Sequence, residues 1–446
     1  MRSRFAWAAA ALYAALFVVL GAIRYDAHRN FVDFGIFAQT TASAFGCFCN
    51  TVEGSHWGVH FSPILYVAGA LVALWRSPYA LIALQAVAGA LTIPPIYAIV
   101  RRRASERVAM LAAIVTFLYP ALAGLIFADF HENGFAPAAV AWMLWSFDDG
   151  RTRLAVAFAL AAIAVKEDQA IFVGIAAALA AWRFRRTMPG MAATFVALAG
   201  FGAAAIFFIK IQPHAAVASH WAPVRFYDWN AGDLRELLAR GVLERAGFFV
   251  LAFAPLAFLP FRSRMMWLAA APLAEVLLSR MSTTYTLGSH YAGAWAGYVL
   301  AAFAFALRAL PEARALRAGW ICAALAAVEL AAANPLHPGL NLRGAQARDI
   351  ALDTALTALP SGVPVATQEE AYTHLALDNP NATVFPEDPN EPVTACLLLV
   401  DAAFPGSPRL VEYAPAIRRY VAAGTYRRLP GPRIRDIDVF RRVDCR

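Results

Sequence analysis

The sequence predicts an α-helical polytopic membrane protein that ends in a small C-terminal α/β domain, and three observations support this fold class. Of the 446 residues, 60% are hydrophobic and 15% are charged, and the mean hydropathy is +0.54, which is too apolar for a soluble chain of this length. Phe5–Ile23 contains no charged residue and is long enough to cross a hydrocarbon core of ~30 Å. From Pro335 onward, apolar runs shorten to strand length.

The first apolar run and the basic residues indicate how the chain enters the membrane. A cleaved signal peptide would have a shorter apolar region than Phe5–Ile23, so we interpret this run as the first span. The net charge of +8 does not indicate a nucleic-acid partner, and we expect none. Most arginines lie in short clusters between apolar runs, where such clusters mark the cytoplasmic ends of transmembrane helices.

Arginine clusters also determine the predicted topology, because every second apolar run must end at one if all the clusters are cytoplasmic. This assignment gives about eleven transmembrane helices and a cytoplasmic N-terminus. The predicted spans are residues 5–23, 78–100, 108–125, 135–147, 154–165, 170–182, 191–209, 247–259, 265–278, 292–307 and 318–333. The apolar segment His60–Trp75 would invert every later cluster. We therefore expect it to form a juxtamembrane or re-entrant helix on the outer surface.

This topology divides the chain into a membrane domain, residues 1–334, and an extracytoplasmic domain, residues 335–446. In the membrane domain the first external loop covers residues 24–77. The polar loops at 128–134, 166–169, 210–245 and 280–291 face the same side. The cytoplasmic loops contain little besides arginine, so we expect the chemistry of the protein on the outer face of the membrane.

The C-terminal domain is predicted from its short apolar runs. The predicted strands are residues 363–368 and 395–402, the predicted helices are Ala345–Leu359 and Leu410–Ala423, and residues 426–443 are predicted to form two strands around a Pro-Gly-Pro turn. No glycine-rich phosphate loop is visible in this part of the sequence. A cap or acceptor-docking module is the interpretation that we favour.

Four cysteines lie in segments predicted to be external. Cys396 and Cys445 are candidates for a disulfide only because both are predicted to lie outside the cytoplasm, where disulfides persist. The alternative is that they remain separate thiols. Cys47 and Cys49 are separated by one residue. That spacing is unfavourable for a disulfide, so we expect them to be unpaired.

Asp33 is the first candidate for catalysis. It lies in the first external loop within VDFGIF, whose apolar residues would hold it near the membrane surface. A carboxylate in such a position can act as a general base toward a hydroxyl group. The alternative is an aspartate that caps a helix beginning near Gly35, and the sequence leaves both open. Gln39, further along the same segment, is counted among the substrate-binding candidates.

The external loop ADFHENGFAP carries Asp129, His131 and Glu132 within four residues. These three side chains could bind a divalent metal ion or orient a base. The alternative is a polar, solvated turn. Their spacing matches no recognised metal motif, so metal dependence stays open.

The external loop VKEDQA carries Lys166, Glu167 and Asp168 between two apolar runs. Three consecutive charges can simply mark the membrane interface. Alternatively, the lysine neutralises a phosphate with a carboxylate as its partner. The remaining substrate-binding candidates, all in external segments, are His60, His290 and Tyr291.

Several of these blocks together resemble a known family. VDFGIFAQ, GVHFSPILYVAGALVAL, LIALQAVAGALTIPPIYAI, LYPALAGLIFADFHENGFAP, AVKEDQA and SHYAG occur in this order and resemble a bacterial membrane family, the domain of unknown function 2079, over most of the chain. The sequence is also similar to the wider GT-C class of membrane glycosyltransferases. That class includes protein O-mannosyltransferases and aminoarabinose transferases.

The GT-C resemblance implies roles for particular residues. Asp33 matches the catalytic aspartate of the first external loop, His60–Trp75 the juxtamembrane element, and Asp129 the second acidic residue. The chain departs from the class in having a single aspartate in the first motif, and its charged-residue-plus-proline feature is reduced to HFSP. These departures leave metal dependence and phosphate recognition open.

The resemblance implies a glycosyltransferase of the bacterial cytoplasmic (inner) membrane that uses a polyprenyl-phosphate sugar. Its partners would be membrane lipid, the lipid-linked sugar donor and an extracytoplasmic glycan, lipid or protein acceptor, with a divalent metal ion as an optional cofactor. Asp33 would be the general base, and Lys166 would stabilise the departing phosphate. The alternatives are a transporter or flippase, which would favour inverted repeats, and a non-catalytic scaffold that presents the C-terminal domain.

Overall fold

A computed structural model describes residues 4–184, 187–215, 224–227, 229–332, 335–337, 341–386, 388, 390–402, 408–429 and 437–445. The chain divides into two compact units, each of which is described by itself. Unit 1 consists of Met1–Val19, Trp57–Leu65 and Ile82–His337, and unit 2 consists of Leu20–His56, Tyr66–Leu81 and Pro338–Arg446. Helices α1 (Arg4–Asp26) and α4 (Pro78–Ala90) each contribute residues to both units.

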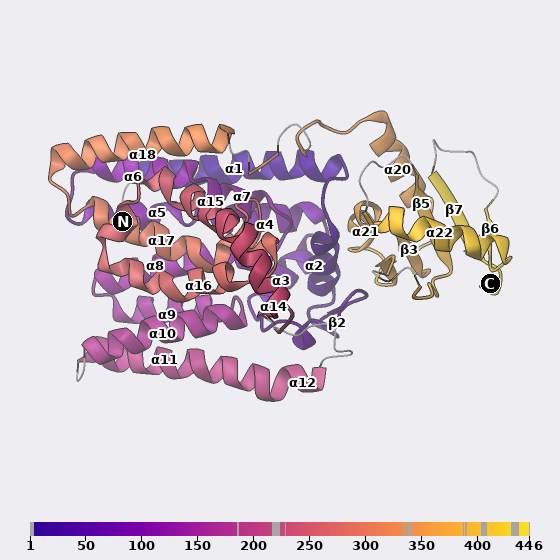
Figure 1. Cartoon of the computed structure of the whole chain (residues 1–446), viewed down its shortest axis with the longest axis horizontal. Coiled ribbons are helices and arrows are strands. Elements are labelled where there is room, and N and C mark those ends of the chain that lie inside the picture. Colours follow the sequence, from indigo (N-terminus) through magenta and orange to yellow (C-terminus); the bar gives the residue numbers. More distant parts are fainter. Residues whose placement is uncertain are drawn as a thin grey trace. The chain divides into compact units, whose positions relative to one another are not determined.

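Unit 1 is helical throughout its described part. Its α-helices are α5 (Ile93–Arg101), α6 (Glu106–Leu118), α7 (Pro120–Phe127), α8 (Ala136–Asp148), α9 (Thr152–Ile163), α10 (Glu167–Arg183), α11 (Met188–Ile206), α12 (Gln212–Ala215), α13 (Val224–Tyr227), α14 (Ala231–Glu236), α15 (Val242–Phe253), α16 (Ala270–Leu278), α17 (Ala292–Leu307) and α18 (Glu312–Ala332). Short 3₁₀ turns lie at η1 (His56–Gly58), η2 (Glu132–Phe135), η5 (Ala254–Leu256), η6 (Leu259–Arg262), η7 (Arg264–Ala269) and η8 (Ser282–Tyr285), and π turns at η3 (Phe207–Ile211) and η4 (Leu237–Gly241). Helices α8 to α11 lie side by side (Figure 1).

Helix α17 forms the centre of unit 1. All of its residues except Phe305 are buried, as expected for a helix that is apolar on every face. Gly293 and Gly297 let neighbouring backbone approach closely, because an added Cβ would lie 2.4 Å from the Asn133 carbonyl oxygen and 2.8 Å from Pro137 Cα. Small residues spaced by four are typical of tight helix packing in membranes. This seam holds the turn η2 against the start of α17.

Within the described part of the chain, four helices are long and apolar enough to cross a membrane, or five if a bent pair counts as one span. The four are Arg4–Asp26, Pro78–Arg101, Met188–Ala215 and Glu312–Ala332, and the bent pair is α6 with α7, which meet at 44°. The chain is therefore a helical membrane protein. The count of eleven spans stays a prediction, because several of the predicted spans correspond to helices shorter than the hydrocarbon core is thick.

Two of the predicted segments can be compared directly with the helices. Residues 108–125, predicted as one span, fall in two helices that meet in a bend at Pro120, because proline disrupts the helix that precedes it. Residues 60–75 contain α3 (Leu65–Leu74), whose 10 residues rise only about 15 Å. This segment is too short to cross a bilayer by itself, in agreement with the prediction that it is not a span.

Unit 2 contains a five-stranded mixed sheet with the strand order β4-β3-β5-β7-β6. Its strands are β3 (Val365–Thr367), β4 (Ala382–Val384), β5 (Leu397–Asp401), β6 (Tyr426–Arg428) and β7 (Ile437–Arg442), and its helices are α20 (Ala347–Thr357), α21 (Glu369–Leu375) and α22 (Pro408–Ala422). The pairs β3–β4 and β3–β5 are parallel, whereas β5–β7 and β6–β7 are antiparallel. The strands predicted at 363–368 and 395–402 are confirmed. The predicted Pro-Gly-Pro turn lies outside the described residues.

Most of the first external loop also belongs to unit 2, where it forms α2 (Val32–Ala42) and a hairpin of β1 (Cys49–Asn50) and β2 (Gly54–Ser55). Cys396 and Cys445 form a disulfide, which confirms that candidate pair. Cys47 and Cys49 are also joined, so the expectation of unpaired thiols is wrong. The turn that precedes the hairpin brings their Cα atoms to 5.2 Å, within the range that a disulfide spans.

Candidate functional site

The candidate site lies in unit 1, where four separate segments bring ionisable side chains together. Glu132 lies on η2, Lys166 precedes α10, His290 precedes α17, and His60 lies in the segment Trp57–Leu65. We call these four residues, together with His131 and Glu167, the unit 1 cluster. Hydrogen bonds of the backbone help to assemble it: Ile64 N–H donates to the Ala164 carbonyl at 2.8 Å, joining the His60 segment to the turn before α10.

Glu132 is the most buried acidic group of the cluster. Its side chain has no exposed surface, and its two carboxylate oxygens lie 2.9 Å from His131 Nδ1 and 3.7 Å from Lys166 Nζ. His131 Nδ1 also accepts a hydrogen bond from Asn133 N–H. Lys166 places a full positive charge next to Glu132. Buried ion pairs of this kind contribute little net stability and are typical of functional sites at membrane depth.

Glu167 forms the second part of the cluster, in the first turn of α10. Its carboxylate accepts from Phe61 N–H at 2.8 Å and lies 2.9 Å from His60 Nδ1. Burial, reinforced by the positive charge of Lys166, lowers the pKa of His60 to about 3. The imidazole is therefore neutral at physiological pH. Its Nδ1–H donates to Glu167, and Nε2 is left with a lone pair.

Lys166 carries the positive charge of the cluster. Burial alone would lower its pKa, but the negative charges of Glu132, Asp168 and Glu167 outweigh burial and raise the pKa overall. Burial raises the pKa of Glu167 and of Asp168, which the charge of Lys166 partly offsets. The lysine thus stays protonated in a nearly dry environment, where a fixed charge acts strongly on an anionic ligand.

His290 and His131 stack face to face, with ring centroids 3.9 Å apart. Burial, together with the neighbouring His131 and Lys166, lowers the pKa of His290 well below its ordinary value. Tyr291 lies against the same ring at 4.2 Å. Two imidazoles and a phenol next to one ammonium group are suited to donating hydrogen bonds to phosphate oxygens.

Two glutamines position the cluster, and sequence patterns gave no reason to assign them this role. Gln85 accepts from His131 N–H at 2.8 Å and donates to the Ile126, Ala128 and Asp129 carbonyls, which fixes the polar loop before η2. Gln169 donates to the Ala294 carbonyl at 3.0 Å, which fixes the start of α10 against α17. Both side chains are buried.

The other predicted site residues lie as follows. Asp129 is buried in the loop that Gln85 holds. Asp33 lies in unit 2, partly buried in the first turn of α2; the N-cap of that helix is Phe31, so Asp33 does not cap a helix beginning near Gly35. Gln39 is buried in unit 2, where its amide bonds to Asn379, Ala382, Thr51 and Tyr372. These bonds tie α2 to the C-terminal part of the unit.

Metal ligation by Asp129, His131 and Glu132 stays a prediction. Among the described residues, the group whose ligand atoms converge well enough to hold a metal ion is a different one, in unit 2. In the unit 1 cluster, the charge opposite Glu132 is supplied by Lys166.

The fold of this chain is similar to that of two solved structures. It is similar to ArnT from Cupriavidus metallidurans bound to undecaprenyl phosphate, with a TM-score of 0.59, 14% sequence identity and 99% of each chain covered. The apo state of the same ArnT aligns with a TM-score of 0.56 and 13% identity over 96% of this chain and 97% of that chain. Identities this low establish the fold and leave activity open.

The family is established by sequence. The family model described as "predicted membrane protein (DUF2079)" matches residues 29–409, and the chain belongs to this family. Among curated proteins, none matches the sequence significantly.

Proposed function

We propose that this protein is a GT-C-type glycosyltransferase that moves a sugar from a polyprenyl-phosphate donor to a hydroxyl acceptor. The observation that carries this proposal is the buried, protonated Lys166, set among the carboxylates and imidazoles of the unit 1 cluster. The cluster belongs to a chain whose fold is similar to that of an undecaprenyl-phosphate-bound ArnT. A lipid phosphate is the ligand class that a fixed ammonium group in a membrane protein suits best.

The proposed chemistry follows from the charges. The acceptor oxygen attacks the anomeric carbon, the bond from that carbon to the phosphate oxygen breaks, and the electron pair leaves with the polyprenyl phosphate. Lys166 stabilises the charge that develops on the leaving phosphate, while His290 and Tyr291 are proposed to orient it. Asp33 is proposed to take the acceptor proton; this role rests on the GT-C resemblance, and the exposed part of its side chain in α2 is compatible with it.

We further propose that the reaction takes place on the outer face of the cytoplasmic membrane. Both disulfides lie in unit 2, and disulfides persist in oxidising compartments. The remaining cysteine, Cys322, is a buried thiol in α18, one of the four candidate spans. This distribution supports an extracytoplasmic position for unit 2 and, with it, for Asp33.

The test is a transfer assay with the full chain reconstituted in lipid. Radiolabelled polyprenyl-phosphate sugars are incubated with envelope extract, and wild type is compared with Asp33→Asn and with the matched control Asp378→Asn, whose carboxylate is exposed in the same unit. We expect transfer by wild type and by the control, and a loss of at least a hundredfold with Asp33→Asn. Equal transfer by all three proteins would show that Asp33 is not the base.

A further inference from the structure

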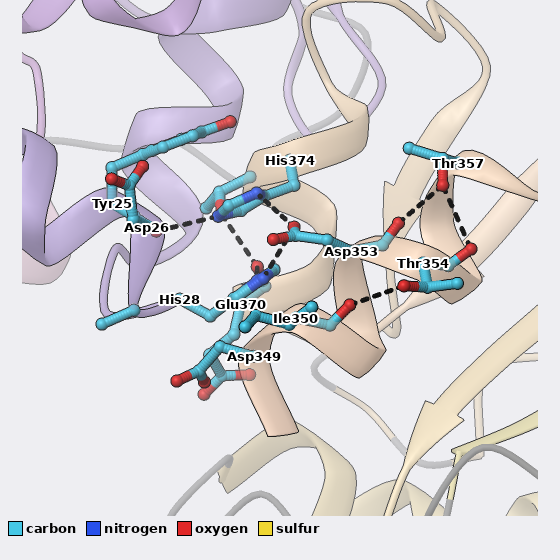
Figure 2. Close-up of polar contacts among 12 residues, drawn as sticks. Tyr25, Asp26, His28, Asp349, Ile350, Asp353, Thr354, Thr357, Glu370 and His374 are labelled. Atoms are coloured by element: carbon cyan, nitrogen blue, oxygen red, sulfur yellow. Dashed lines mark hydrogen bonds and ion pairs between the residues drawn. The ribbon is translucent and has the colours of Figure 1, made fainter. Parts of the chain in front are cut away.

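Two histidines and an aspartate converge in unit 2. His28 follows α1, Asp353 lies on α20 and His374 lies on α21 (Figure 2). His28 Nε2 is 3.0 Å from Asp353 Oδ1, and His374 Nδ1 is 3.4 Å from the same oxygen. One ligand atom from each residue can be chosen such that all three lie within 4.8 Å of one another. For comparison, two ligand atoms that each lie about 2.1 Å from the same zinc ion are closer to each other than 4.8 Å.

The second nitrogen of each ring faces a backbone carbonyl, which can only accept a hydrogen bond. His28 Nδ1 is 3.4 Å from the Glu370 carbonyl oxygen, and His374 Nε2 is 3.0 Å from the Tyr25 carbonyl oxygen (Figure 2). Those two nitrogens therefore carry the hydrogens. In the neutral rings, the nitrogens that face Asp353 carry lone pairs. The lone pairs of His28 Nε2 and His374 Nδ1 thus converge with a carboxylate oxygen of Asp353. Because all three atoms are acceptors, this arrangement needs a positive charge between them.

The surroundings disfavour supplying that charge by protonating both rings. The rings stack with centroids 3.7 Å apart, so two imidazolium charges would lie against each other. The His28 side chain has no exposed surface. A single bound cation satisfies all three ligands without placing charge on either ring.

The rings are also held in place before any ion binds. Tyr25 stacks on His374 at 4.1 Å, so His374 is sandwiched between Tyr25 and His28. His28 has a backbone φ of 51°, which is uncommon for a residue other than glycine and is often found where function fixes the backbone. Carbonyl groups that accept from the outer nitrogens of ligating histidines are a regular feature of metal sites. Asp353 is about half exposed, which leaves an entry path for an ion.

We propose that His28 Nε2, His374 Nδ1 and the carboxylate of Asp353 form a site for a divalent cation of the zinc type. Two imidazole nitrogens and one carboxylate oxygen are a ligand set that Zn²⁺ accepts. The ion would tie the segment after α1 to the helices α20 and α21 and so hold the first external loop against the C-terminal part of unit 2. This site is independent of the proposed transferase activity.

The test measures binding of Zn²⁺ itself to the full chain in detergent, purified without a polyhistidine tag and stripped with a chelator. Competition with a chromophoric zinc indicator gives stoichiometry and affinity for wild type and Asp353→Asn. The matched control is Asp378→Asn, an exposed aspartate of unit 2. We expect one tightly bound zinc per chain in wild type and in the control, and a 10- to 100-fold weaker affinity in Asp353→Asn.

His374→Gln is a second variant, and thermal unfolding of each stripped protein verifies that it is folded. Added zinc should raise the Tm of wild type and of Asp378→Asn, and should leave the Tm of Asp353→Asn and His374→Gln unchanged. If stripped, folded wild type binds no zinc, the proposal is wrong. Equal zinc affinity in wild type and both site variants would overturn it as well, because the ion would then be bound elsewhere.

Discussion

Substitution of Lys166 tests whether this lysine compensates the buried acids of the unit 1 cluster. Lys166→Met would remove the ammonium group that lies 3.7 Å from the Glu132 carboxylate, whose side chain has no exposed surface. The lysine also offsets the neighbouring Glu167 and Asp168. Removing one partner of a buried ion pair costs about 3–5 kcal/mol, and with three acids affected we expect the upper end of this range.

Glu132→Gln should cost less, about 1–3 kcal/mol, because Lys166 keeps Glu167 and Asp168 as partners. The double variant removes both members of the pair. Its cost should fall below the sum of the two single variants by about 0.5–3 kcal/mol.

The assay is thermal unfolding of the full chain in lipid nanodiscs, followed by tryptophan fluorescence. Lys210→Met is the matched control, since the sequence contains only two lysines and Lys210 is exposed. We expect Lys166→Met to lower the Tm most, Glu132→Gln to lower it less, and the control to leave it unchanged. Equal effects of Lys166→Met and Lys210→Met, or strictly additive effects in the double variant, would refute charge compensation by Lys166.

Three further predictions concern stability. Gly35→Ala should destabilise unit 2, because the added Cβ would lie 2.3 Å from Cε1 of the buried Tyr372; protection of the α2 amides from hydrogen exchange should fall, and unchanged protection would contradict the close contact. The pKa of His60 is lowered to about 3 by burial, so the folded state binds fewer protons than the unfolded state between pH 6.5 and 3, and stability falls as the pH drops through this window. Between pH 7.5 and 5, the free energy of unfolding of His60→Asn should therefore fall by about 2 kcal/mol less than that of wild type. Denaturant unfolding at the two pH values measures this difference, and equal decreases in the two proteins would show that His60 titrates normally. Replacing Cys396 and Cys445 by alanine, which opens a loop with a sequence separation of 49, should cost about 4 kcal/mol in denaturant unfolding of unit 2, and no change in midpoint would show that the bridge does not stabilise the fold.

Local signals in the sequence predicted much of the architecture. Short apolar runs predicted β3 and β5, the lack of charge in Phe5–Ile23 predicted the span in α1, and the positions of the arginine clusters predicted that His60–Trp75 does not span the membrane. The bend at Pro120 was readable in principle, because proline restricts the residue before it. A continuous apolar run does not by itself indicate such a bend.

The candidate sites depended on contacts that sequence cannot supply. Lys166 and Glu132 stood out as charges at the ends of apolar runs, but nothing in the sequence pairs them with each other. His28 and Asp353 are 325 positions apart, and no local pattern relates such residues. Glutamines such as Gln85 are equally common as surface residues, and only their backbone partners reveal a positioning role.

Lipid binding tests the central claim most directly, because it requires neither the sugar nor the acceptor to be known. The full chain in nanodiscs is titrated with undecaprenyl phosphate and, separately, with undecaprenol, and the bound lipid is measured by native mass spectrometry. We predict that wild type and Lys166→Arg retain the phosphate lipid, that folded Lys166→Met loses at least tenfold in affinity, and that undecaprenol binds weakly to all three. Equal binding of both lipids, or no effect of Lys166→Met, would contradict the claim that the unit 1 cluster recognises a lipid phosphate.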